Sequence, residues 1–127
     1  VSAWRFDVHV LRLRVTTLVP NRGEPTSPHI FLDMGGGNLL ACFDSPEHQA
    51  TPTVRGLGSM HHVALKAEPR HYQELLATLK NRKTPHSLHG TEEAGSVYFR
   101  DPDDILIEVT TGRRCRPRPN PFGRAAP

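Results

Sequence analysis

Residues 58–65, GSMHHVAL, and residues 96–109, SVYFRDPDDILIEV, are the stretches that decide the fold of this chain. The first predicts a strand, and the second predicts two strands joined by a turn at the Asp-Pro-Asp-Asp run. A histidine opens the first strand, and Glu108 lies inside the last one between two apolar residues. A carboxylate in such a strand needs a partner, because burying an unpaired charge is costly. A metal ion held by a histidine and Glu108 is the best partner that the sequence offers.

A helix is predicted between these two stretches. Pro69 suits its first turn, and four apolar residues recur at the spacing of one helix face. These residues are Tyr72, Leu75, Leu76 and Leu79. Strands are expected near residues 85–89, at 96–99 and at 105–111. The second half is therefore predicted to run strand, helix, strand, strand, strand.

The first half repeats the end of this pattern. Residues 29–33 and 38–43 are strand-like runs on either side of Gly35-Gly36-Gly37. They align with the last two strands of the second half, which gives an internal repeat of about 65 residues. Residues 12–17 fit a preceding strand, and residues 4–11 are expected to be at most a helix end. The opening strand of the second half has no counterpart in the first, and residues 44–58 are predicted to be a linker.

Charge is distributed unevenly along the 127 residues, which suffice for a modest core. Residues 113–127 hold five arginines and no acidic residue, so without them the net charge of +3 becomes −2. We expect this basic, proline-rich tail to be disordered, with an acidic partner as the alternative. The net positive charge of the chain comes from this tail, so no nucleic acid is expected as a partner. No membrane partner is expected either, because no apolar run reaches the length of a span.

The two cysteines, Cys42 and Cys115, do not suggest a disulfide framework. No signal peptide is recognisable. Both observations are typical of a cytoplasmic protein.

The chain resembles the vicinal oxygen chelate superfamily, which includes glyoxalase I, extradiol ring-cleaving dioxygenases, and the fosfomycin and bleomycin resistance proteins. The residues that carry the resemblance are 61–65, 97–109 and the glycine hairpin of 31–41. It implies an α+β fold of paired βαβββ modules with curved mixed sheets, the first module truncated at its N-terminus. Residues 1–50 would form that incomplete module, residues 51–112 the second module, and residues 113–127 the disordered tail.

In this superfamily the metal ligands come from the first and last strands of each module. Carried over by position, the second module supplies His62 and Glu108. The last-strand position of the first module is Ala41, which cannot ligate, and its first-strand position is missing. Histidine and carboxylate ligands without a thiolate suit Fe(II) or Mn(II), with Zn(II) or Ni(II) as alternatives.

The resemblance to extradiol dioxygenases extends to two further positions. Those enzymes hold the metal with two histidines and one glutamate, and place a histidine and a tyrosine nearby on the strands before the glutamate. His89 and Tyr98 occupy matching positions here. His89 could move a catechol proton, and the Tyr98 hydroxyl could hydrogen-bond a substrate oxygen. Both residues also suit structural roles, as a turn histidine and a core aromatic.

Neighbouring residues are weaker candidates. His61 should point to the opposite face of the strand from His62, because side chains alternate along a strand. His29 is a candidate substitute ligand, but its position on a hairpin strand favours a surface or structural role. Cys42 should face away from Ala41 as a small buried residue. Arg12 and Asp104 stand where the family has glycines, which departs from the pattern of an intact enzyme.

Three functions follow from the resemblance. The first is a metal-dependent dioxygenase that cleaves a catechol-like aromatic substrate. The second is a glyoxalase-like lyase or isomerase acting on a dicarbonyl-type substrate, which needs another carboxylate near Ala41. The third is a non-catalytic small-molecule binder of the bleomycin-resistance kind. A homodimer, with whole or swapped modules, is expected to cover the edge left by the missing strand.

Overall fold

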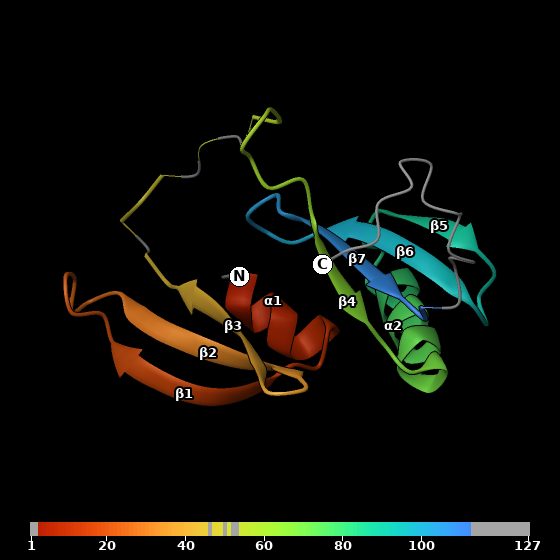
Figure 1. Cartoon of the computed structure of the whole chain (residues 1–127), viewed down its shortest axis with the longest axis horizontal. Coiled ribbons are helices and arrows are strands. Elements are labelled where there is room, and N and C mark those ends of the chain that lie inside the picture. The colour runs from red at the N-terminus through yellow and green to blue at the C-terminus, as the bar shows by residue number, and fades with distance from the viewer. Residues whose placement is uncertain (1–2, 46, 50, 52–53, 113–127) are drawn as a thin grey trace, which may run out of the picture.

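The computed structural model describes residues 3–45, 47–49, 51 and 54–112. They form two helices and two sheets, one sheet from each half of the chain (Figure 1). The expected α+β class of paired modules is confirmed. The predicted tail, with Cys115, lies outside the described residues, as do parts of the predicted linker.

The second half follows the predicted order. Its elements are β4 (Val63–Lys66), α2 (Pro69–Asn81), β5 (His86–Gly90), β6 (Gly95–Arg100) and β7 (Leu106–Thr110). The strands form one sheet in the order β4-β7-β6-β5, in which β4 runs parallel to β7 and the other pairs are antiparallel. Helix α2 begins directly after Glu68 with Pro69 in its first turn, as expected, because proline needs no hydrogen-bond acceptor there.

The first half consists of α1 (Ala3–Val10), β1 (Arg14–Pro20), β2 (Pro28–Gly35) and β3 (Asn38–Phe43). Its strands form an antiparallel sheet in the order β1-β2-β3. The β2–β3 turn requires glycine, because Gly35, Gly36 and Gly37 all have positive φ. Helix α1 makes about two turns, more than the helix end expected from the sequence. Within the described residues no strand precedes α1, so the first half has one strand fewer than the second.

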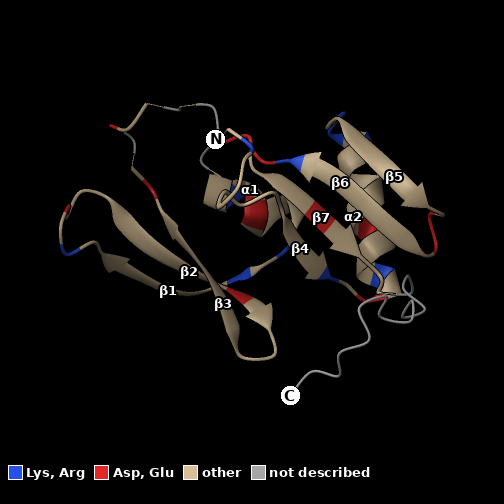
Figure 2. Ribbon diagram, turned by 45° about the horizontal axis from the view of Figure 1, so that its top comes forward, with Lys and Arg blue, Asp and Glu red and all other residues tan. Residues whose placement is uncertain are grey.

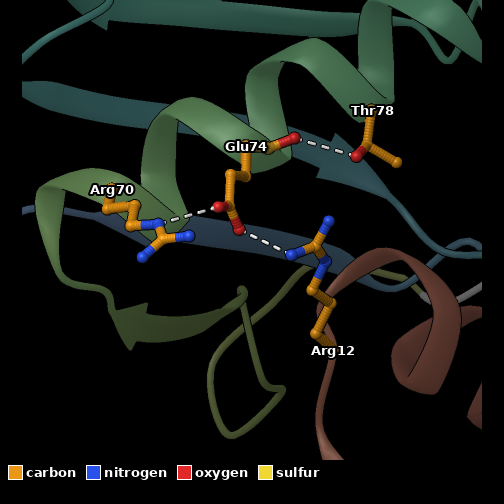
Figure 3. Close-up of polar contacts among 4 residues, drawn as sticks. All are labelled: Arg12, Arg70, Glu74 and Thr78. Atoms are coloured by element: carbon orange, nitrogen blue, oxygen red, sulfur yellow. Dashed lines mark hydrogen bonds and ion pairs between the residues drawn. The ribbon is translucent and has the colours of Figure 1, made fainter.

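Both helices share one apolar core on the same face of the second sheet. The buried face of α2 is the predicted one, Tyr72, Leu75, Leu76 and Leu79. Phe6 and Val10 of α1 join it, and the Phe6 ring lies 6.1 Å from that of Phe99. Figure 3 shows the polar contact beside this core, in which Glu74 of α2 accepts hydrogen bonds from Arg12 and Arg70. Helix α1 thus ties the first half to the second.

The two residues that stand where the family has glycines, Arg12 and Asp104, both have an unusual backbone conformation. Arg12 follows α1 with φ of 58°, and Asp104 lies in the β6–β7 turn with φ of 67°. This left-handed region favours glycine. The glycines of the family pattern therefore correspond to two positions with positive φ, although this chain has larger residues there.

No helix of the described ranges is long and apolar enough to cross a membrane.

Candidate functional site

The strand register of the second sheet places the four predicted site residues on the face opposite the helices. Tyr98 of β6 pairs directly with Glu108 of β7. His62 stands two residues before Ala64, the β4 partner of Glu108, and His89 of β5 pairs with Ser96. Since cross-strand partners share a face and alternate residues along a strand return to it, these side chains form one row across the sheet.

Interatomic distances confirm that this row is continuous. The Nε2 atom of His62 lies 3.1 Å from Oε2 of Glu108. The Tyr98 ring contacts the rings of both histidines edge-on, with centroids 5.9 Å from His62 and 5.2 Å from His89. The structure therefore brings all four residues together, from the start of β4 to β5.

Hydrogen bonds to the Glu108 carboxylate set its protonation state. Burial alone would raise the pKa of Glu108, but hydrogen bonds from Ser96, Tyr98 and His62 outweigh it, and the pKa is lowered. The pKa of Tyr98 is raised, first by burial and then by the neighbouring Glu108 carboxylate. At neutral pH the site thus presents a charged carboxylate beside a protonated phenol.

Ser96 is a member of this site that the sequence interpretation missed. Its hydroxyl is one of the groups that lower the pKa of Glu108. Strand alternation could have found it, because Ser96 precedes Tyr98 by two residues and so shares its face.

The expectation for His61 is wrong. Its Nδ1 atom lies 2.8 Å from Nδ1 of His62, so the two rings are neighbours and do not project to opposite faces. Strand alternation does not extend to His61, because β4 begins only at Val63 and His61 lies two residues before it. His62 consequently has a partner on each ring nitrogen, His61 on Nδ1 and Glu108 on Nε2.

The predicted positions of the first half lie on β2 and β3. Ala41 pairs with Phe31 and is exposed. Cys42 faces the other way, as expected, but is only half-buried; burial first, and then the charges of Asp7, Asp101 and Asp103, raise its thiol pKa to about 11. The ring of His29 lies against those of Phe31 and Phe43, with both centroid distances 4.1 Å. This aromatic packing is the structural role that the sequence favoured for His29.

Two donor atoms of the site suit a divalent metal. His62 Nε2 and Glu108 Oε2 lie 3.1 Å apart, and imidazole and carboxylate suit Fe(II), Mn(II), Zn(II) or Ni(II). Across the described ranges, however, no three His, Cys, Asp or Glu side chains form a group that could hold a metal ion. The described part of one chain therefore offers two ligands.

Comparison with known proteins was made for sequence and for structure. No protein-family model and no curated protein matches the chain. Among solved structures, a glyoxylase/bleomycin resistance protein/dioxygenase domain from Frankia sp. EAN1pec superposes with a TM-score of 0.69 at 15% identity, covering 87% of each chain. The chain has the vicinal oxygen chelate fold. The resemblance stated from the sequence is confirmed at the level of fold.

Other proteins with the vicinal oxygen chelate fold that resemble this chain have different functions. A putative dioxygenase from Bacillus subtilis superposes with a TM-score of 0.67 at 21% identity, over 83% of this chain and 34% of that one. The fosfomycin resistance protein FosX from Listeria monocytogenes, in complex with Mn(II), superposes with a TM-score of 0.60 at 14% identity, over 87% and 81%. At these sequence identities the similarity shows a shared fold only, and proteins with this fold catalyse many different reactions.

Proposed function

We propose that this chain is a metal-dependent, dioxygenase-like protein that cleaves the ring of a catechol-like substrate beside its two hydroxyl groups. The convergence of His62 Nε2 and Glu108 Oε2, 3.1 Å apart, is the observation that carries the proposal. In this proposal these two atoms hold the metal, with Fe(II) or Mn(II) favoured over Zn(II) or Ni(II). When bound, the metal would supply a Lewis-acid centre with free positions for a vicinal diol.

The protein groups around the pair have roles that follow from their protonation states. Glu108 stays ionised because its pKa is lowered, so it remains a ligand at neutral and mildly acidic pH. Tyr98 stays protonated because its pKa is raised; its O–H donates to Glu108, and its hydroxyl oxygen can accept a hydrogen bond from a substrate hydroxyl. His89 is the proposed proton acceptor for a catechol hydroxyl, because its ring stands on the other side of Tyr98 from His62.

The remaining ligands are proposed to come from a second copy of the chain. Two ligands are too few for the three-ligand arrangement that leaves room for a bidentate diol and O₂. A homodimer, with whole or swapped modules, supplies further histidines and carboxylates without any change within one chain. The division into modules at residues 50–51 and a cytoplasmic location belong to the same proposal.

Oxygen uptake tests the proposed activity. Purified protein reconstituted anaerobically with Fe(II) or Mn(II) is mixed with catechols in aerated buffer, while dissolved O₂ and the absorbance of ring-opened product are followed. We expect one O₂ consumed per product, and a loss of at least about tenfold in rate for His89→Ala, in line with a general base. His71→Ala, an exposed histidine of α2, is the control. Absence of O₂ uptake with every catechol and either metal would contradict a dioxygenase.

A second candidate, a small-molecule binding protein without catalysis, is favoured by one observation. Ala41 occupies the position where the family pattern has a ligand, so one chain lacks the four-ligand site of a glyoxalase. A binder would retain ligand affinity in a metal-free His62→Ala variant, whereas the proposed dioxygenase would lose both metal and activity.

A further inference from the structure

A cavity of about 880 Å³ lies on the other side of β4 and β7 from the row of His62, Tyr98 and Glu108. Its walls come from α1, β3, β4 and the β6–β7 turn, so both halves of the chain contribute. Val63 and Ile107 line it, and these residues alternate with His62 and Glu108 along their strands. His62 and Glu108 are therefore not among the residues that line this cavity.

The lining of this cavity combines apolar side chains with acidic ones. Its carboxylates are those of Asp7, Asp44, Asp101 and Asp103. None of its described lining residues is lysine or arginine, and His48 is the one that can take up a positive charge. Figure 2 shows the acidic segments of α1 and of the β6–β7 turn on the side where the two halves meet. The four carboxylates thus give the described lining a negative bias.

Asp7 is the residue that points to a ligand. The residue is 4% exposed, and its Oδ1 atom has no hydrogen-bond partner among the described residues. A buried carboxylate oxygen without a partner is costly, and is relieved either by a proton or by a cation brought from outside. Since Asp7 lines the cavity, such a cation has space beside it.

Two of the other carboxylates, those of Asp44 and Asp101, are held in place by contacts of their own. Trp4 Nε1 donates to Asp44 Oδ2 over 2.9 Å. Asp101 Oδ1 accepts from the backbone N–H groups of Asp103 and Ile105, over 2.9 and 2.8 Å. These neutral donors fix the carboxylates without cancelling their charges. The carboxylates of Asp44 and Asp101 are therefore positioned before any ligand arrives, which lowers the cost of ordering them on binding.

We propose that this cavity binds an organic cation, a primary ammonium group on an apolar or aromatic body. The ammonium would lie against Asp7, with Asp101 and Asp103 close by. The body would pack on Leu40, Val63 and Ile105, and Trp4 offers an aromatic surface. A metal ion does not suit this site, because the described carboxylates form no metal-binding group of three and much of the lining is apolar.

The binding should depend on pH. Burial first, then the charges of Asp101 and Asp103, raise the pKa of Asp7 to about 7. A bound ammonium favours the ionised carboxylate, so affinity should fall as pH drops from 8 to 6. The other groups that face the cavity are Asp44, His48 and Cys42; the pKa of the Cys42 thiol, at about 11, leaves it uncharged in this range.

The single tryptophan of the chain, Trp4, lines the cavity and so reports on binding by its fluorescence. The probe is 4-phenylbutylammonium, titrated beside the uncharged 4-phenylbutanol and the anionic 4-phenylbutanoate. We expect saturable binding of the amine at pH 8, with the alcohol at least about tenfold weaker, the difference that corresponds to 1.4 kcal/mol. Asp7→Asn should remove the preference for the amine, and Asp103→Asn should reduce it.

Three controls sharpen the test. Glu93→Gln removes an exposed carboxylate of the β5–β6 turn and should leave amine binding unchanged. His62→Ala should also leave it unchanged, which separates this cavity from the proposed metal site. If Asp7→Asn does not fold, the exposed Asp103→Asn carries the test. Equal affinity for amine and alcohol, or undiminished amine binding in a folded Asp7→Asn or Asp103→Asn variant, would overturn the proposal.

Discussion

His62 and Glu108 are 46 residues apart in the sequence, yet His62 Nε2 and Glu108 Oε2 lie 3.1 Å apart. Parallel pairing of β4 with β7 produces this contact, because Ala64 is the register partner of Glu108 and His62 precedes it by two residues. The sheet therefore aligns the two side chains before any ligand binds.

Removal of the Tyr98 hydroxyl should raise the pKa of Glu108. Tyr98→Phe deletes one of the hydrogen bonds that hold this pKa low, and should lower the free energy of unfolding by about 1 kcal/mol. Carbon-detected NMR titration of the Glu108 carboxyl measures the first effect. Ser87→Ala, which alters the exposed cross-strand neighbour of Tyr98, should leave the Glu108 titration unchanged. A Glu108 pKa unaffected by Tyr98→Phe would contradict the assigned contact.

The buried Asp7 should make the protein less stable as pH rises. The folded-state pKa of about 7 exceeds the ordinary value of 3.8, so between these values the folded state binds more protons than the unfolded state. The Asp7 contribution is therefore fully present below pH 3.8 and is lost as pH rises through about 7. Urea unfolding between pH 5 and pH 8 should show a steeper decline for the wild type than for Asp7→Asn. Parallel pH profiles would refute the raised pKa.

Asp104→Gly should increase the free energy of unfolding by about 0.5–1 kcal/mol, because φ of 67° suits glycine better than aspartate. The ion pair of Asp104 with Arg100 is exposed, so its loss costs little. Asp103→Gly is the matched control, since Asp103 is not among the residues with positive φ, and it should lower stability through the added freedom of the unfolded chain. The urea midpoint of Asp104→Gly should rise and that of Asp103→Gly should fall. A shift of both midpoints in the same direction would argue against backbone strain at Asp104.

Helix α1 should be essential for the stability of the second half. Phe6→Ala removes a buried ring from the shared core and should cost about 3–5 kcal/mol. Phe43→Ala is the control, because that side chain is 56% exposed and its truncation should cost about 1 kcal/mol or less. Thermal unfolding followed by circular dichroism measures both variants. Similar losses of stability in Phe6→Ala and Phe43→Ala would show that α1 does not complete the core.

Sequence patterns predicted most of the elements because each depends on local signals. The Leu75–Leu79 face of α2 follows from helical spacing, and the β2–β3 hairpin follows from its three glycines. The arrangement of His62, Glu108, Tyr98 and His89 required the family resemblance, since strand pairing across the sheet is non-local.

Other features could not be obtained from local patterns. The position of α1 on the second core depends on contacts between Phe6 and Phe99 that no local pattern encodes. The mutual contact of His61 and His62 arises because β4 starts one residue after them. The partnerless Asp7 oxygen became visible only once the helices and sheets were packed together.

The metal content of the purified protein is the most direct test of the proposed centre. Protein loaded with Mn(II) or Fe(II), freed of excess metal and analysed by inductively coupled plasma mass spectrometry should retain about one metal per chain. Ligand loss in His62→Ala or Glu108→Gln should reduce metal affinity at least about tenfold, as measured by competition with a chelator. His71→Ala should retain the wild-type affinity. Equal metal affinity in the wild type, His62→Ala and Glu108→Gln would contradict the assignment of these residues as ligands.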